Sequence, residues 1–216
     1  MPDAAVEPVS YPRQKARTRS FQCGRPRSFA IAGSRVFFIR SAHGTDPAGS
    51  LWLLDLAVGS GEQVPGAQSP GEQSPGEQSP GEQCVVDVGA LPTDTGEDLP
   101  AAERARRERM REVTSGITAF NLDADGTRAA FAVNGTPYLL DLRGSEPAVR
   151  ALPAPGPVVD PRLDPTGTKV AVVVDRGLNL IVVVSEPDGR ADAVQPLWQA
   201  QGPDESIGLA DFIAAE

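Results

Sequence analysis

The chain has 216 residues, of which 40% are hydrophobic and only 5% aromatic, and it contains 22 Gly and 21 Pro. This mix favours many short strands and turns over long helices, and the length allows one large domain or two small ones. The net charge of −9 opposes a general nucleic-acid or anionic-membrane surface, because both need clustered cations.

No stretch reaches the roughly 18 apolar residues that a membrane-spanning helix needs, and the first residues lack the apolar run of a secretion signal. We therefore expect a cytoplasmic protein that makes no membrane contact. Cys23 and Cys84 are too few for a disulfide framework and lack the spacing of a zinc site, so we expect two free thiols.

Residues 1–20 mix Pro, Arg, Gln and Ser without apolar periodicity, which predicts a peripheral lead-in. Its basic residues alternate with uncharged ones, as in an arm that binds nucleic acid. Since no aromatic residues are interleaved and the whole chain is acidic, we expect no nucleic-acid partner.

Residues 29–56 contain FAIAGSRVFFIRS and then LWLLDL, two strand-like runs separated by turn-forming residues. Two further copies follow at residues 117–142 and 158–184. Each copy has an apolar strand, a turn with Gly, a basic residue two positions later, a second apolar strand and a third. In the last two copies the turns are DADG and DPTG, which suit a reversal with a positive φ.

Two interruptions enlarge the spacing between the first two copies. Residues 64–83 read VPGAQ and then SPGEQ three times, a composition too poor in apolar side chains to fold, so we predict an exposed disordered loop rather than a docking tract. Residues 99–113 read LPAAERARRERMREV and predict one inserted charged helix. That helix is either a solvated element or a source of an arginine that points into a substrate cavity.

The spacing from Arg128 to Lys169 is 41 residues, which matches the roughly 40 to 45 residues of a four-stranded propeller blade. The sequence thus predicts an all-β fold, a partial β-propeller of about three to four blades of antiparallel meanders over residues 21–216. Because propellers typically need 4 to 8 blades, we expect the chain to be part of a longer protein.

No pattern in the chain supplies chemistry of its own. No serine has glycine at both flanking positions of a G-x-S-x-G motif, and His43, the sole histidine, lies in SAHGTDP without a partner pattern, which indicates a surface loop. Phosphate-loop and metal-ligand motifs are also missing, and the DADGT turn at Asp123 lacks the later glutamate of a calcium loop. We expect no catalytic residue, no cofactor and no metal.

The order of features resembles the N-terminal propeller of bacterial dipeptidyl peptidase IV-like enzymes, serine peptidases of the prolyl oligopeptidase family. The resemblance rests on the strand pair at residues 29–56, on AAERARRERMRE leading into SGITAFNLDADGTRAAFAV, and on the terminal DFIAAE. It implies that Glu216 matches the first glutamate of an acidic pair that binds the free amine of a peptide substrate. It also implies an arginine that holds a substrate carbonyl. We take Arg107 as its candidate, although the sequence does not distinguish it from the other arginines of residues 101–112.

The resemblance further implies that the catalytic α/β-hydrolase domain, with its serine, aspartate and histidine, is absent from this chain, and it allows a homodimer of the full-length protein. Under this hypothesis the partners are peptide substrates and the chain alone is inactive. The alternative is a non-catalytic propeller that serves as a protein-interaction module. A third hypothesis is a defunct gene remnant.

Overall fold

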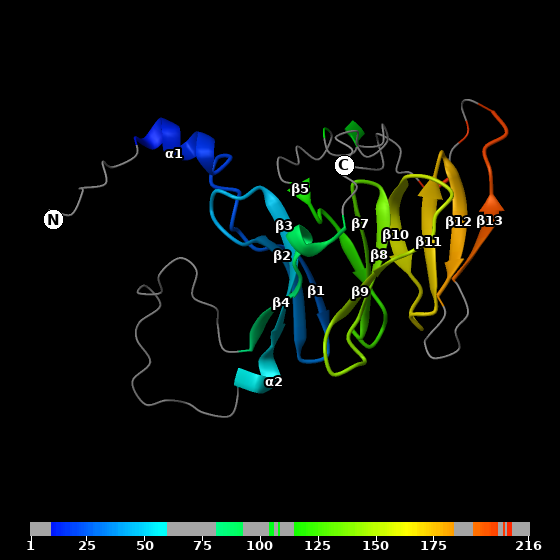
Figure 1. Ribbon diagram of the computed structural model, residues 1–216, viewed down its shortest axis with the longest axis horizontal. Helices are drawn as coiled ribbons and strands as arrows, with labels where there is room; N and C mark the ends of the chain where they lie inside the picture. The colour runs from blue at the N-terminus through cyan, green and yellow to red at the C-terminus, as the bar shows by residue number, and fades with distance from the viewer. Residues whose placement is uncertain are drawn as a thin grey trace, which may run out of the picture.

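The computed structural model describes residues 10–59, 81–92, 104–105, 108, 115–183, 192–202, 205 and 207–208. Three antiparallel sheets stand side by side in chain order (Figure 1). Each is a meander in which consecutive strands pair, so the prediction of an all-β partial β-propeller is confirmed.

The strands of each sheet follow one another along the chain. The first sheet holds β1 (Arg27–Ala32), β2 (Arg35–Ser41), β3 (Ala48–Asp55), β4 (Glu82–Val86) and the two-residue β5 (Ser115–Gly116), which pairs in parallel with the start of β3. The second holds β6 (Phe120–Leu122), β7 (Arg128–Val133), β8 (Thr136–Asp141) and β9 (Ala148–Ala151). The third holds β10 (Val158–Leu163), β11 (Lys169–Val174), β12 (Gly177–Val182) and β13 (Ala193–Trp198). The structure also has the helices α1 (Tyr11–Arg17) and α2 (Leu56–Gly59), the 3₁₀ turn η1 (Val88–Ala90), and helical conformation at Arg104, Ala105 and Glu108.

Equivalent positions in the three sheets follow from strand register. The basic residue that opens the second strand pairs with the residue that ends the third strand, namely Arg35 with Asp55, Arg128 with Asp141 and Lys169 with Val182. Because side chains alternate between the two faces of a strand, this register assigns every residue of β2, β7 and β11 to one of two faces.

Apolar residues on facing sheets form two cores. Phe37, Ile39 and Leu53 of the first sheet pack with Phe131 and Tyr138 of the second. On the other face of the second sheet, Ala130 and Leu139 pack with apolar residues of the third sheet, which include Val170, Val172 and Ile181. Since β1 contacts β6 and β6 contacts β10, the first strands line the side on which the sheets converge, as in a propeller.

Aspartates close the predicted DADG and DPTG turns. Asp123 Oδ1 accepts hydrogen bonds from the backbone N–H groups of Thr127 (2.8 Å) and Arg128 (3.0 Å). Asp164 Oδ1 does the same for Thr168 and Lys169, both at 2.7 Å. The glycine of each turn has a positive φ, as the sequence predicts.

One boundary prediction is wrong. The predicted loop over residues 64–83 ends inside β4, where Glu82 pairs with Leu54 in register and its carboxylate lies 2.6 Å from Arg40 Nη2. Residues 64–80 lie within the span 60–80, outside the described residues. The lead-in over residues 1–20 contains α1, a helix with Pro at its start and no buried residue, which does not contradict a peripheral position. Both elements are short, and neither carries an apolar period that sequence reasoning can detect.

Candidate functional site

The turns and loops of the three sheets collect at two opposite ends. One end holds the β1–β2, β6–β7 and β10–β11 turns. The other holds the β7–β8 turn, which begins after Val133, and the β11–β12 turn, which begins after Val174. The start of β3, where β5 pairs, belongs to this second end, as Figure 1 shows at the top. We call it the groove end.

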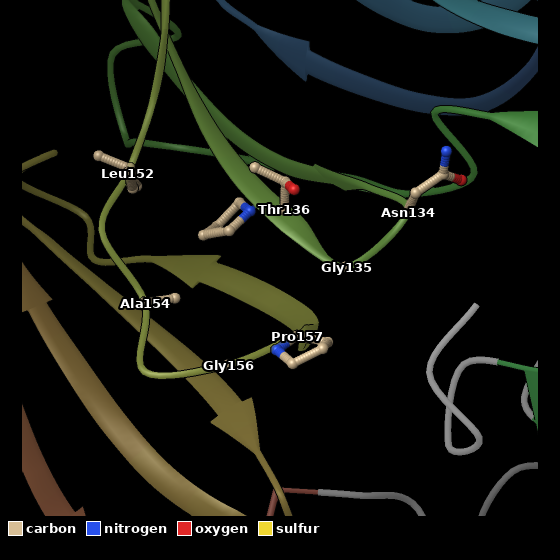
Figure 2. A pocket seen from close by; sticks show the side chains of 8 residues that line it. Asn134, Gly135, Thr136, Leu152, Ala154, Gly156 and Pro157 are labelled. Carbon is tan, nitrogen blue, oxygen red and sulfur yellow. The ribbon is translucent and has the colours of Figure 1, made fainter. Parts of the chain in front are cut away.

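A groove of about 210 Å³ lies at this end of the second sheet. The β7–β8 turn forms one wall and the loop between β9 and β10 forms the other (Figure 2). The lining residues are Asn134, Gly135, Thr136, Pro137, Leu152, Ala154, Gly156 and Pro157. The groove is therefore built from a hairpin turn and a Pro-rich connection rather than from strand faces.

Backbone hydrogen bonds hold the two walls together. Asn134 and Gly135 have φ values of 51° and 83°, the left-handed pair that a tight hairpin turn requires. The N–H of Val158 donates to the carbonyl of Gly135 and the N–H of Leu152 donates to that of Pro137, both at 2.8 Å. The two walls of the groove are thus joined through the backbone.

The lining of the groove has limited chemistry. Its side chains offer one amide, one hydroxyl and small apolar surfaces, with no carboxylate, amine, imidazole or thiol. Such a site can hydrogen-bond a peptide backbone and take up small apolar side chains. It has no group with an acid or base pKa suited to proton transfer. The arrangement supports binding rather than catalysis.

The residues that flank the inserted segment 93–114 are hydrogen-bonded at the groove end on both sides. Before it, the hydroxyl of Tyr138, next to the groove residue Pro137, donates to the carbonyl of Pro92 at 3.1 Å. Burial raises the pKa of Tyr138, which keeps this hydroxyl protonated as a donor. After it, the N–H groups of Ser115 and Ile117 donate to the carbonyls of Pro47 and Gly49.

The C-terminal segment reaches the same end. The N–H of Ile207 donates at 3.2 Å to the carbonyl of Arg176 in the β11–β12 turn. Gly208 lies so close to Val173 that a Cβ on the glycine would overlap that valine side chain. Ile207 and Gly208 therefore lie at the groove end of the third sheet.

The two predicted substrate-binding residues, Glu216 and Arg107, lie outside the described residues. Of the predicted helix over residues 99–113, Arg104, Ala105 and Glu108 are described, and all three are helical. Sequence reasoning missed the groove. The available signals were the Asn-Gly pair, typical of a tight hairpin, and PAPGP at residues 153–157.

Other candidate groups are dispersed. His43 is exposed in the β2–β3 loop, and Cys23 and Cys84 are both free thiols, as predicted. Within the described part of the chain, no three His, Cys, Asp or Glu side chains are arranged to hold a metal ion. The same described residues include no helix long and apolar enough to cross a membrane.

No protein-family model and no curated protein sequence matches this chain. Its structure is similar to the β-propeller domain of Cps50 (Swd1) from Myceliophteria thermophila, with a TM-score of 0.43 and 13% identity over 82% of this chain and 40% of that one. It is also similar to the β-propeller domain of the Trilobed protease from Pyrococcus furiosus, with a TM-score of 0.43 and 8% identity over 82% of this chain and 44% of that one. For the tricorn protease the TM-score is 0.35, with 14% identity over 80% of this chain and 11% of that one. The chain therefore spans less than half the length of each of these proteins.

Proposed function

We propose that the chain is the N-terminal propeller portion of a serine exopeptidase that removes dipeptides from peptide N-termini. In this proposal the propeller gates the substrate, Glu216 binds the free amine, and Arg107 holds a backbone carbonyl. The nucleophilic serine comes from an α/β-hydrolase domain outside this chain.

One observation carries the proposal: the segments that contain Arg107 and Glu216 both attach at the groove end. The first lies between Pro92 and Ser115, which are anchored beside the groove and beside β3. The second continues from Gly208, and the eight residues up to Glu216 span at most about 28 Å when extended. A carboxylate and a guanidinium at one end of a propeller would be suited to hold the two ends of a dipeptide unit.

The chemistry of the two residues explains how the cleavage position is set. A carboxylate in a partly dry cavity favours an ammonium ion, and a guanidinium donates strongly to a carbonyl oxygen. With both bonds made, the peptide enters to a constant depth, so the nucleophile meets the bond after the second residue. An acetylated peptide loses the first of these bonds.

Peptide binding to this chain tests the proposal. We expect a C-terminally labelled tripeptide with a free amine to bind about tenfold more tightly than its N-acetylated form, since one charge-assisted hydrogen bond is worth about 1.5 kcal/mol or more. Glu216→Gln should remove that preference, so that both peptides bind alike in fluorescence anisotropy. The matched control is Glu146→Gln, which removes an exposed carboxylate from the β8–β9 turn at the opposite end. If E216Q keeps the preference for the free amine, the proposal is wrong.

The uncharged lining of the groove favours a second candidate function, a non-catalytic interaction module that binds an extended segment of another protein. This function requires no free amine. It predicts that acetylated and free peptides bind equally and that Ala154→Trp, which fills the groove, abolishes binding of both. Under the peptidase proposal, A154W leaves the discrimination between the two peptides intact.

A further inference from the structure

Positive and negative charges are distributed unevenly along the chain. Residues 8–45 hold eight Lys and Arg residues and no acidic residue, whereas residues 46–216 hold 12 Lys and Arg residues and 27 acidic residues. Within the first stretch, residues 11–25 form α1 and the turn that follows it, which we call the N-terminal unit. Its basic residues are all exposed: Arg13, Lys15, Arg17, Arg19 and Arg25. An exposed cationic unit thus belongs to an otherwise acidic chain.

Hydrogen bonds and one buried side chain hold the N-terminal unit in place. In the turn after α1, the N–H of Ser20 donates to the carbonyl of Lys15 at 2.7 Å. Cys23 is only 7% exposed, and the N–H of Gly24 donates to the hydroxyl of Ser41 at 2.7 Å. The unit is therefore fixed to the end of β2, so a ligand that binds it does not have to order a loose tail.

Most cations of the N-terminal unit lack an acidic partner. Those that make no ion pair within the described part of the chain are Arg13, Lys15, Arg17 and Arg25. Arg13 and Arg17 stand four residues apart on α1, a spacing at which like charges repel. Asp46, the next acidic residue along the chain, accepts the N–H of Ala48 at 2.8 Å. A bound anion would offset the repulsion among these cations.

Two exposed aromatic rings belong to the same unit. Tyr11 and Phe21 are 65% and 45% exposed, and their ring centroids lie 6.1 Å apart. The turn that carries Phe21 has left-handed φ values of 47°, 59° and 63° at Arg19, Ser20 and Phe21. Three such values in a row are unfavourable for residues other than glycine, and strain of this kind is concentrated in ligand-binding segments. The ring pair thus adds an apolar surface to the positive charges.

The N-terminal unit stands at the groove end of the first sheet. A Cβ on Gly24 would lie 3.2 Å from the Cα of Gly44 in the β2–β3 loop, which leads into the start of β3. Figure 1 shows α1 at the top, on the same side as β5. Since the lining of the groove carries no charged side chain, the unit supplies this end with charge that the groove lacks.

We propose that the N-terminal unit binds an acidic peptide segment with apolar side chains between its carboxylates. Guanidinium groups donate strongly to carboxylates, often through two parallel hydrogen bonds. The exposed rings of Tyr11 and Phe21 pack against an apolar side chain of the segment. The inference goes beyond the proposed function and does not depend on it, because the unit binds carboxylates rather than the free amine of a peptide.

Charge and shape favour an acidic peptide over the other polyanions. A nucleic acid or an anionic membrane extends beyond the unit and would also meet the acidic remainder of the chain, which repels it. α1 offers a bilayer no apolar face, since its sequence YPRQKAR has only Tyr11 and Ala16 as apolar residues. A short acidic segment contacts the cations alone.

Fluorescence anisotropy with the full chain tests the proposal. The first probe is a labelled, N-acetylated peptide of about twelve residues with the repeat Glu-Glu-Phe. The second probe has Gln in place of every Glu, and the third has Ala in place of every Phe. We expect the first to bind at least about tenfold more tightly than the second and about threefold more tightly than the third. Because acetylation removes the free amine, the outcome is independent of the role proposed for Glu216.

Two matched double variants locate the binding site. Lys15→Gln combined with Arg17→Gln should weaken binding of the acidic peptide at least about fivefold, because charge-assisted hydrogen bonds are lost. Since α1 has no buried residue, this variant keeps the fold. Arg162→Gln combined with Lys169→Gln removes the same charge from exposed positions at the opposite end of the third sheet. This control should bind the peptide as the wild type does.

A third variant tests the aromatic pair. Phe21→Gly removes the ring, and glycine accepts the φ of 63° without strain. It should weaken binding of the Phe-containing peptide about threefold and leave the Ala-containing peptide unaffected.

Three outcomes would overturn the proposal. The first is equal binding of the acidic peptide and its Gln counterpart, and the second is an equal effect of the two double variants. The third is tighter binding of a labelled oligothymidylate than of the acidic peptide, or co-sedimentation of the chain with phosphatidylserine vesicles, since either would assign the N-terminal unit to another class of polyanion.

Discussion

The guanidinium of Arg128 donates from Nη1 to the carbonyl oxygen of Gly167 at 2.5 Å, and so joins the second sheet to the turn of the third. The same side chain is paired with Asp141 at 3.1 Å and is only 3% exposed. Its counterpart in the first sheet, Arg35, lies 3.8 Å from Asp55 and is 37% exposed. One repeated basic position therefore has a buried bridging role in one sheet and a surface role in another.

Replacement of Arg128 should strongly lower the free energy of unfolding. Arg128→Met leaves the Asp141 carboxylate and the Gly167 carbonyl without their buried donor, and breaking such a pair from one side typically costs about 3–5 kcal/mol. Because Asp141 keeps its bond to Arg143, we expect the lower end, about 3 kcal/mol, from urea unfolding. Arg35→Met is the matched control and should cost under about 1 kcal/mol, since exposed ion pairs contribute little. Equal losses for the two variants would show that the bridge to Gly167 contributes nothing.

Alanine substitutions at two turn glycines distinguish the effect of backbone strain from that of steric contact. Gly126 and Gly33 have nearly the same φ, 62° and 60°, but a Cβ would overlap Ala32 only at Gly126. Alanine in this left-handed conformation costs roughly 1–2 kcal/mol, and crowding in a packed site adds about 1–3 kcal/mol. Gly33→Ala should therefore lose only the stability that the backbone strain costs. Gly126→Ala should lose that amount and also the amount that steric crowding costs. Thermal and urea denaturation measure both losses. A smaller loss of stability for G126A than for G33A would contradict the steric contact between Gly126 and Ala32.

The stability contribution of Asp141 should depend on acid pH. Desolvation by itself would raise the pKa of Asp141, but hydrogen bonds from Arg143 and the charges of Arg128 and Arg143 outweigh it and lower the pKa from 3.8 to about 2. A lowered folded-state pKa stabilises the protein above pH 3.8, and this contribution is lost as the pH falls toward 2. The difference in unfolding free energy between wild type and Asp141→Asn should thus shrink by about 1–2 kcal/mol from pH 6 to pH 2.5. A difference that stays constant over this range would be evidence against the ion pairs.

Cys84 should react slowly despite its exposed position. Although the residue is exposed at the surface, protein atoms around the sulfur partly desolvate the thiol, and together with the charge of Asp87 this raises the pKa of Cys84 from 9.0 to about 11. The thiolate fraction at pH 8 then falls about 100-fold, while the greater basicity of the thiolate recovers part of the rate, for a net decrease of about tenfold. Iodoacetamide kinetics on a Cys23→Ser background, compared with the same protein in urea, measure this effect. Asp87→Asn should accelerate the folded-state reaction, and an unchanged rate would remove Asp87 as a cause.

Sequence patterns predicted the first three strands of each sheet but did not locate the fourth. β2, β3, β7, β8, β11 and β12 are buried apolar runs between turn formers, and such runs are detectable by composition. β9 reads AVRA and β13 reads AVQPLW, and both are largely exposed. An outer strand buries little surface and carries little hydrophobic pattern, so the 41-residue period implied its existence without giving its position.

The sequence alone determined the architecture of this protein, because repetition is a local property: each copy carries its own apolar strands, a turn with Gly and a basic residue two positions later. The tertiary structure alone decided what each copy does, because the same position faces a different neighbour in each sheet. Phe120 is partly buried against the core, whereas Phe29, at the same position of the first sheet, is 64% exposed. Likewise, the groove arises where a hairpin turn meets a loop about 20 residues later in the chain. Such long-range contacts depend on how sheets pack, which no single repeat encodes.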